Sequence, residues 1–199
     1  MLIGTKIKGF AMLPAPAQLL VRPDSSQYVG LWTMRNGSQV TIRPIRPDDE
    51  PSMVRFHEIL SDRTVYMRYF ASLSLAMRTA HERLRRICYT NFDCEIVLVA
   101  EHQSLETAQR EIVGVGRLNK LETAAEAEIA VLVADEHQHK GLGTELIRRL
   151  IGAASDLGVS RITAEMLRDN LTIQTIFKRL GFRLRFLRDP RSVQAMLDL

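Results

Sequence analysis

The chain has 199 residues, of which 46% are hydrophobic and 25% are charged, as is typical of one soluble globular domain. Its formal net charge of +4 is too small to indicate nucleic-acid binding, although it suits a phosphate-rich cofactor or an acidic partner. The two cysteines, Cys88 and Cys94, are too few for a secreted disulfide framework or a common zinc site, so we expect free thiols, no metal and a cytoplasmic protein.

The N-terminal region lacks the signals of a folded element. Residues 1–38 show no sustained periodicity and end at an Asn-Gly turn signal. An apolar stretch at residues 10–21 follows two lysines, as in a signal peptide, but two prolines interrupt it. No run approaches the length of a membrane-spanning helix, so we expect no membrane association. We assign residues 1–38 to a tail or linker and residues 39–199 to one folded domain.

The first half of that domain predicts a strand, two helices and a hairpin. Residues 40–45 alternate with β-branched side chains and lead into an acidic, proline-rich helix start. One helix is expected over about residues 50–60 and a basic one over about residues 76–89. Residues 95–101 and 111–121 have strand character with a polar segment between them, which predicts an antiparallel hairpin.

The second half alternates strands and helices. Residues 128–133 are an apolar strand, and from Leu142 the apolar period changes from two to 3.6 until Gly158. A strand at residues 161–166, a helix that Asn170 caps, and a strand at residues 182–187 follow. The order predicts a mixed α+β domain.

The most informative segment is residues 138–144, between a predicted strand and the most amphipathic helix. It reads Gln138, His139, Lys140, Gly141, Leu142, Gly143 and Thr144. The first amides of a helix lack internal partners and lie at the positive end of its dipole, so a pyrophosphate would find donors here. The spacing matches neither the dinucleotide fingerprint nor the phosphate loop. Spacing alone leaves open that the glycines only form a tight turn.

Gln-x-x-Gly-x-Gly at a strand-helix junction resembles the acetyl-CoA pyrophosphate signature of the GNAT superfamily of N-acetyltransferases. Asn170, followed by Phe177 and residues 180–182, resembles the later motif that flanks the pantetheine arm. The resemblance covers about residues 40–187. It implies a central mixed, mostly antiparallel sheet of six to seven strands, with the fourth and fifth splayed, flanked by about four helices. It implies that acetyl-CoA is bound by the segment 138–144 together with Leu132, Val133, Asn170, Ile173 and Phe177.

A narrower resemblance concerns the acceptor. Residues 41–50, 61–70 and 127–130 resemble the acetyltransferase domain of bacterial protein lysine acetyltransferases, which is often fused to an acyl-CoA-synthetase-like domain. This resemblance implies that the acceptor is a lysine amine on a protein such as an acyl-CoA synthetase. The chain has no room for the fused domain, so we expect a stand-alone member or an excised domain, with its oligomeric state open.

The same resemblance makes Glu128 the general base, directly or through water. A lysine amine has an ordinary pKa of about 10.4, so attack on a thioester at neutral pH needs a proton acceptor. We expect residues 129–131 to raise the pKa of Glu128 by desolvation. Glu126 shares its strand face and is the reserve candidate, while an exposed glutamate without a role stays open. In the family a main-chain amide stabilises the oxyanion, here that of Leu132 or Val133.

Two features leave alternatives open. Many GNAT enzymes protonate the leaving thiolate with a tyrosine where Phe177 stands, and a phenylalanine cannot do so; the thiolate would then leave unassisted or take a proton from water. Asn170 would serve equally well as a helix cap alone. Acetylation of a small-molecule amine and a non-catalytic acetyl-CoA-binding module therefore remain alternative functions.

Acceptor contacts are expected from residues 61–70. Tyr66, Arg68 and Tyr69 are candidates for lining an acceptor cleft, although such aromatic residues are more often part of a core. The basic residues of the predicted helix 76–89 would face either an acidic partner or solvent.

Overall fold

The computed structural model describes residues 25–103, 109–121 and 125–199. The strands are β1 (Gly30–Thr33), β2 (Gln39–Pro44), β3 (Glu95–Gln103), β4 (Arg110–Lys120), β5 (Glu126–Val133), β6 (Arg161–Leu167), β7 (Arg183–Phe186) and β8 (Ser192–Asp198). The α-helices are α1 (Glu50–Glu58), α2 (Asp62–Tyr69), α3 (Leu75–Arg78), α4 (His81–Cys88), α5 (Leu142–Asp156) and α6 (Leu171–Arg179). Three short 3-10 helices are η1 (Ser25–Tyr28), η2 (Pro47–Asp49) and η3 (Asp135–His137).

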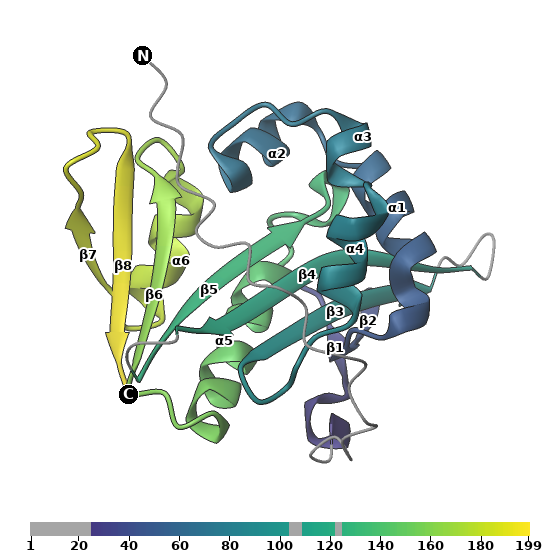
Figure 1. The fold of residues 1–199 in the computed structure, drawn as a ribbon, viewed down its shortest axis with the longest axis horizontal. Helices are drawn as coiled ribbons and strands as arrows, with labels where there is room; N and C mark the ends of the chain where they lie inside the picture. Colours follow the sequence, from purple (N-terminus) through teal and green to yellow (C-terminus); the bar gives the residue numbers. More distant parts are fainter. Residues whose placement is uncertain (1–24, 104–108, 122–124) are drawn as a thin grey trace.

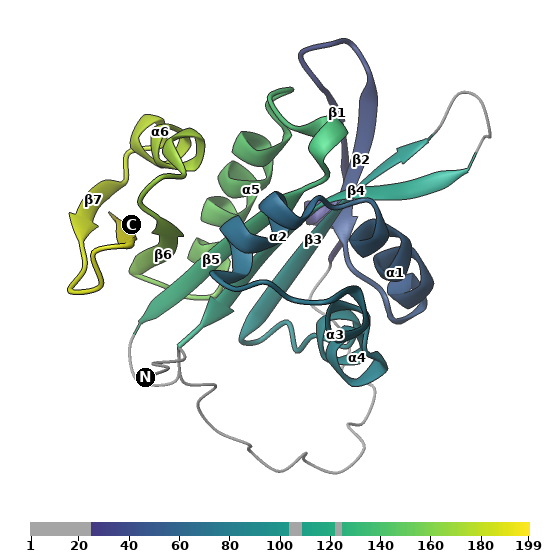
Figure 2. The same cartoon turned by 90° about the horizontal axis from the view of Figure 1, so that it is seen from above.

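All eight strands form one sheet in the order β1-β2-β3-β4-β5-β6-β8-β7 (Figure 1). The β5–β6 pair is parallel, and the other neighbouring pairs are antiparallel. Helices α1 to α4 cover one face of the sheet, whereas α5 and α6 lie on the other (Figure 2). The predicted hairpin is β3–β4, and the predicted mixed, mostly antiparallel architecture is confirmed.

The central strands are buried on both faces. Successive side chains of a strand point to opposite faces. In β3, Ile96, Leu98 and Ala100 pack with α5, while Val97 and Val99 pack with α1 and α4. The sheet therefore separates two cores and holds its middle strands rigidly beneath the site described below.

The sheet has eight strands, two more than the six strand segments that the sequence predicts. Within the predicted tail, the described residues 25–38 contain η1 and β1, and β1 pairs with β2. Four residues are too few for a visible period, so the sequence did not indicate this strand. The C-terminal β8 does have alternating apolar residues, Val193, Ala195 and Leu197, a signal that our sequence analysis overlooked. The apolar stretch at residues 10–21 lies outside the described residues.

The helices over β2 to β5 also differ from expectation. Residues 61–70 contain α2, whose N-cap Ser61 accepts a hydrogen bond from the amide of Thr64. The single helix expected over residues 76–89 is two helices, α3 and α4. A separate N-cap, Ser74, begins α3 by accepting from the amide of Met77.

A buried ion cluster fixes the path from β2 into α1. The Arg43 guanidinium donates to both carboxylate oxygens of Asp49, at 2.7 Å each, and to Glu101 at 2.9 Å. Asp49 also accepts the main-chain amide of Arg46 at 2.7 Å. Arg43 and Asp49 are only 5% and 6% exposed, so their charges are compensated by this cluster and not by water.

Candidate functional site

The strands β5 and β6 separate soon after they begin. They pair over three residues only, Glu126 with Arg161, Ala127 with Ile162 and Glu128 with Thr163. Beyond this point both strands continue, β5 to Val133 and β6 to Leu167, and they diverge (Figure 1). The predicted splay of the fourth and fifth strands is confirmed, counted from β2 as the first predicted strand.

The amide and carbonyl groups of alternate β5 residues point either to β4 or to this gap. In an antiparallel ladder, alternate residues turn their amide and carbonyl groups to the same neighbour. The amide of Ala134 donates to the carbonyl of Val113 in β4, at 2.9 Å, so the amide and carbonyl of Leu132 also face β4. The backbone groups of Val131 and Val133 therefore face the gap. Of the two expected oxyanion donors, Val133 is the one with a suitable amide direction.

The N-terminus of α5 lies at the end of this gap. Gly141 is its N-cap with a φ of 90°, and no side chain among the described residues caps the helix. A Cβ at Gly141 would lie 3.2 Å from Cη2 of Trp32, so glycine is required both by conformation and by space. The amides of residues 142–144 are thus available to an anion, as the sequence predicts.

The first residue of the glycine motif has an unexpected partner. The amide nitrogen Nε2 of Gln138 donates to the carbonyl of Val133 at 3.1 Å and to Oγ1 of Thr64 at 3.0 Å. It therefore satisfies a carbonyl that faces the gap and connects the loop after β5 to α2. Sequence spacing offers no signal for the contact with Thr64, because 74 residues separate the two side chains.

The later motif residues lie on α6. The side-chain oxygen of Asn170 accepts from the amide of Ile173 at 3.3 Å, so Asn170 does cap α6. Phe177 is 3% exposed and packs edge-on against Phe182, with 4.7 Å between ring centroids. Ile173 packs against the same core. These side chains border β6, across the gap from β5.

Glu128 is exposed, so the expectation that residues 129–131 bury it is wrong. Ile129 and Val131 turn to the other face of the sheet, toward α5, because strand side chains alternate. Glu128 pairs across the sheet with Asn119 of β4 and Thr163 of β6. Its carboxylate thus lies at the mouth of the gap, on the face that carries α2.

Glu126 lies on the same strand face as Glu128 but has a different environment. It forms an ion pair with Arg161 at 3.0 Å. The Glu126 carboxylate is thus held by a partner on β6, where the two strands still pair, whereas Glu128 lies at the point where they separate.

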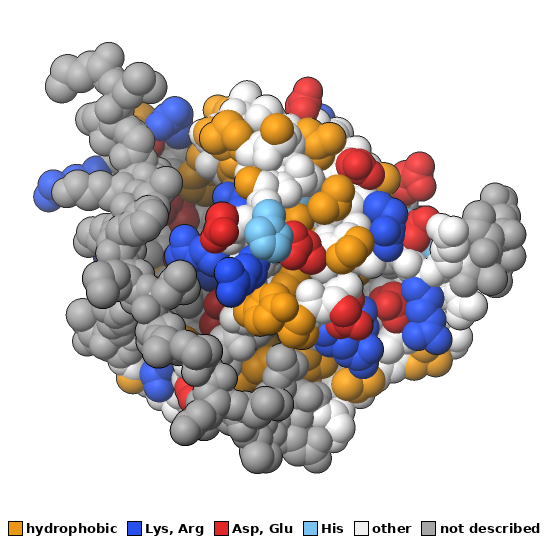
Figure 3. Space-filling model, turned by 45° about the vertical axis from the view of Figure 1, so that its right-hand side comes forward, with side chains coloured by type: hydrophobic (Ala, Val, Ile, Leu, Met, Phe, Trp, Pro, Cys, Tyr) orange, Lys and Arg blue, Asp and Glu red, His pale blue; other side chains and the backbone are white. Residues whose placement is uncertain are grey.

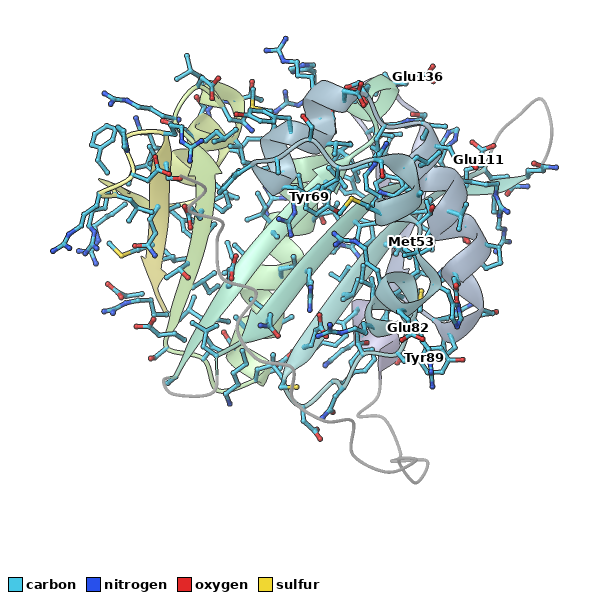
Figure 4. All side chains as sticks on the ribbon, turned by 45° about the horizontal axis from the view of Figure 1, so that its top comes forward. Met53, Tyr69, Glu82, Tyr89, Glu111 and Glu136 are labelled. Carbon is cyan, nitrogen blue, oxygen red and sulfur yellow. The ribbon has the colours of Figure 1, made fainter. Side chains whose placement is uncertain are left out.

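Helix α2 places basic and aromatic side chains beside Glu128. Burial lowers the pKa of Arg68, while Tyr69 and then Glu128 act in the opposite direction, so Arg68 is within electrostatic reach of Glu128. Tyr69 projects from α2 toward the sheet (Figure 4) and packs against the core under α1 and α4. The guanidinium groups of Arg68 and Arg83 lie 5.2 and 4.9 Å from its ring centroid. Tyr69 is therefore a core residue as well as a neighbour of the site.

A hollow of about 430 Å³ opens between α2 and the end of β6. It is lined by Tyr66, Leu167, Arg168, Asp169 and Arg191. The sequence indicated Tyr66 as a candidate acceptor contact but gave no sign of the other four, which the divergence of β6 brings opposite α2.

The basic residues of α4 do not face one way. Arg83 turns inward to Tyr69, and His81 pairs with Glu50 of α1 at 2.6 Å. Acidic and basic side chains are interspersed on the side of the molecule that carries α1 and α4 (Figure 3). This mixture favours a solvated surface over a dedicated acidic-partner site.

Three further features of the described residues bear on their chemistry: the Cys88 thiol, the arrangement of metal-ligating side chains and the length of the helices. Burial raises the pKa of Cys88 to about 12, which makes this thiol a poor nucleophile. No group of three or more His, Cys, Asp or Glu side chains in the described ranges is arranged to hold a metal ion. Among the same residues, each helix is too short or too polar to cross a membrane.

Comparison with known families identifies the domain. The model of the acetyltransferase (GNAT) domain matches residues 39–183. The chain belongs to the GNAT acetyltransferase family. Acetyltransferase Pat from Mycolicibacterium smegmatis is 29% identical over 149 residues, which are 74% of this GNAT chain and 42% of that relative. The chain therefore spans less than half the length of this relative. Acetyltransferase PA5475 from Pseudomonas aeruginosa is 29% identical over 150 residues, 75% of this chain and 78% of the relative.

Solved GNAT structures resemble the whole described domain. The crystal structure of the GNAT domain of S. lividans PAT superposes with a TM-score of 0.77 and 26% identity, over 87% of this chain and 98% of that one. The structure of yncA from Salmonella typhimurium, solved with its cofactor acetyl-CoA, has a TM-score of 0.58 and 20% identity over 80% of this chain and 94% of that one. The second likeness concerns the fold alone.

Proposed function

We propose that this GNAT protein transfers the acetyl group of acetyl-CoA to the side-chain amine of a lysine on another protein. The observation that carries the proposal is the gap between β5 and β6, with the free N-terminus of α5 at its end and Glu128 at its mouth. The resemblance of residues 41–50, 61–70 and 127–130 to bacterial protein lysine acetyltransferases supports a protein acceptor. Two free cysteines suit the cytoplasm, where acetyl-CoA is available.

The donor would occupy the gap as an extra strand. Its pyrophosphate would bind the amides of residues 142–144, with Lys140 adding positive charge. The amide groups of its pantetheine arm would pair with the backbone of Val131, as a peptide pairs with an exposed strand, because the Val133 carbonyl already accepts from Gln138. The further contacts we propose are Leu132, Gln138, His139, Gly141, Asn170, Ile173 and Phe177.

The chemistry requires one proton acceptor and one oxyanion donor. The lysine nitrogen attacks the thioester carbonyl carbon, its proton passes to Glu128 directly or through water, and the carbon–sulfur bond breaks. The amide of Val133 stabilises the oxyanion. The products are an acetylated lysine and coenzyme A, whose thiolate takes a proton from water because Phe177 has none to give.

A second candidate acceptor is a small-molecule amine. The hollow of about 430 Å³ beside Tyr66 and Asp169 has the size of an ordinary small-ligand site. Its lining carries Arg168 and Arg191 beside Asp169, so it would suit an amine that also bears an acidic group, such as an amino acid.

Two measurements test the proposal. Titration calorimetry of the purified protein with acetyl-CoA is expected to show binding, and an absence of heat would end it. Incubation with acetyl-CoA and a cell extract, followed by mass spectrometry, is expected to reveal new acetyl-lysines. Acetylation confined to a panel of polyamines and amino acids would favour the small-molecule acceptor, and binding without any transfer would favour a regulatory module.

A further inference from the structure

Asp135 links two parts of the protein that are far apart in the sequence. It is the first residue of η3, directly after β5 and before the glycine loop. Its carboxylate accepts three hydrogen bonds from α2: the amide of Ser61 at 2.9 Å, Oγ of Ser61 at 2.6 Å and Oγ1 of Thr64 at 2.7 Å. One side chain thus holds the whole first turn of α2.

Thr64 extends this connection to the cofactor loop. While its hydroxyl donates to Asp135, the same oxygen accepts from Nε2 of Gln138, which also donates to the carbonyl of Val133. The hydroxyl group is therefore used in both directions. Asp135, Thr64 and Gln138 form a closed network between the start of α2, the end of β5 and the loop before α5, which we call the α2 clasp.

The charge of Asp135 is suited to this role. Partial burial alone would raise the pKa of its carboxyl, but the hydrogen bonds from Ser61 and Thr64 outweigh burial and hold the pKa below its ordinary value. The carboxylate stays ionised at neutral pH, and hydrogen bonds to an ionised acceptor are stronger than neutral ones.

The clasp holds the helix that forms one side of the site. Helix α2 carries Tyr66, which lines the hollow opposite β6, and Arg68, which is within electrostatic reach of Glu128. The other end of the clasp lies at Val133 and Gln138, where the donor is expected to bind. If a bound donor restricts the motion of the loop, the three side chains of the α2 clasp would therefore also restrict the motion of α2 on the acceptor side.

We propose that Asp135 is a positioning residue which, through Thr64 and Gln138, couples acetyl-CoA binding at the α5 loop to the placement of α2 over Glu128. This inference rests on the proposed function, because it takes acetyl-CoA as the ligand of the loop. The coupling is energetic: a donor that rigidifies residues 138–144 also reduces local opening of α2. The acceptor side is then in place once the donor is bound.

Amide hydrogen exchange of residues 62–69, measured with and without acetyl-CoA, tests the coupling. In the wild type, acetyl-CoA is expected to slow exchange in α2 by about threefold or more. Thr64→Val removes the shared hydroxyl with little change in shape and is expected to abolish that slowing, while the calorimetric Kd for acetyl-CoA stays within about threefold. Thr79→Val is the matched control, because the Thr79 hydroxyl donates only within its own helix, to the carbonyl of Leu75.

Asp135→Asn is the second variant and covers the case in which Thr64→Val does not fold. It is expected to reduce the slowing while keeping the size of the side chain. Equal slowing in the wild type and both variants would overturn the coupling and leave the proposed function intact. Loss of acetyl-CoA binding in the variants but not in the control would assign the clasp to the cofactor loop alone and would also overturn it. An absence of acetyl-CoA binding to the wild type would instead refute the proposed function, and the coupling with it.

Discussion

Gly116 of β4 and Leu150 of α5 touch so closely that a Cβ on Gly116 would lie 2.9 Å from Cδ1 of Leu150. Gly114, two residues earlier, leaves similar space for Leu142, with 3.1 Å to its Cδ2. These glycines let α5 approach the sheet closely, which sets the position of the α5 N-terminus relative to the gap.

We expect Gly116→Ala to destabilise the fold by about 1–3 kcal/mol through overpacking, as measured by urea unfolding. Gly152 lies in α5, and a Cβ there would meet no atom within 4 Å. Gly152→Ala is therefore expected to stabilise the protein by about 0.5–1 kcal/mol. A loss of stability in Gly152→Ala as well would contradict the assignment of the Gly116→Ala loss to the contact with Leu150.

Glu128→Gln is expected to lower kcat by about a hundredfold to ten-thousandfold, because it removes the proton acceptor. Calorimetry should find the acetyl-CoA Kd nearly unchanged, since the expected donor contacts lie on the loop and strand backbone. Glu126→Gln is the informative comparison, as Glu126 shares the strand face but is paired with Arg161. A larger loss of kcat in Glu126→Gln than in Glu128→Gln would exchange the roles of the two residues.

His57 should make the fold acid-sensitive. It is 1% exposed, and burial, followed by the charges of Arg78 and Arg83, lowers its pKa to about 4. The unfolded chain therefore binds a proton near pH 6.5 that the folded chain refuses until about pH 4. Stability from neutral His57 is complete above pH 6.5 and falls by about 3 kcal/mol as the pH drops to about 4.

Urea unfolding at several pH values measures this contribution. His57→Leu should flatten the pH dependence of the free energy of unfolding across that window. An unchanged slope in His57→Leu would refute the role of His57.

Asp49→Ala is expected to cost about 3–5 kcal/mol, because it leaves Arg43 buried with much of its charge uncompensated. The exposed pair of Asp189 and Arg191, at 3.0 Å, offers a control, since Asp189→Ala should lower the unfolding temperature much less than Asp49→Ala does. Thermal unfolding of both variants provides the comparison, and similar losses would show that burial of the Arg43 cluster contributes little.

Local patterns were sufficient for the elements that carry the motif. The change of apolar period at Leu142 located α5, and the glycine spacing located the loop before it, which we propose as the pyrophosphate site. The splay of β5 and β6 came from the family resemblance, because no local pattern encodes the divergence of two strands. Helix α2 was missed, since it has only one buried residue, Val65, and therefore little apolar periodicity.

Side-chain partners were the least predictable part of the site. The contact between Gln138 and Thr64 had no signal in the sequence, and neither had the hydrogen bonds that Asp135 accepts from Ser61 and Thr64. Both contacts depend on where α2 packs, which is a tertiary outcome. Glu128 was expected to be desolvated from its apolar sequence neighbours, but alternation sends Ile129 and Val131 to the opposite face.

The parting of β5 and β6 leaves a short free strand edge in the middle of a sheet, where most proteins have such edges only at the margin. A donor that pairs with this edge would complete the hydrogen bonding of the sheet. The unfolding temperature of the protein would then rise with the concentration of the donor. At a donor concentration of a hundred times Kd, this gain in stability is about 2.7 kcal/mol.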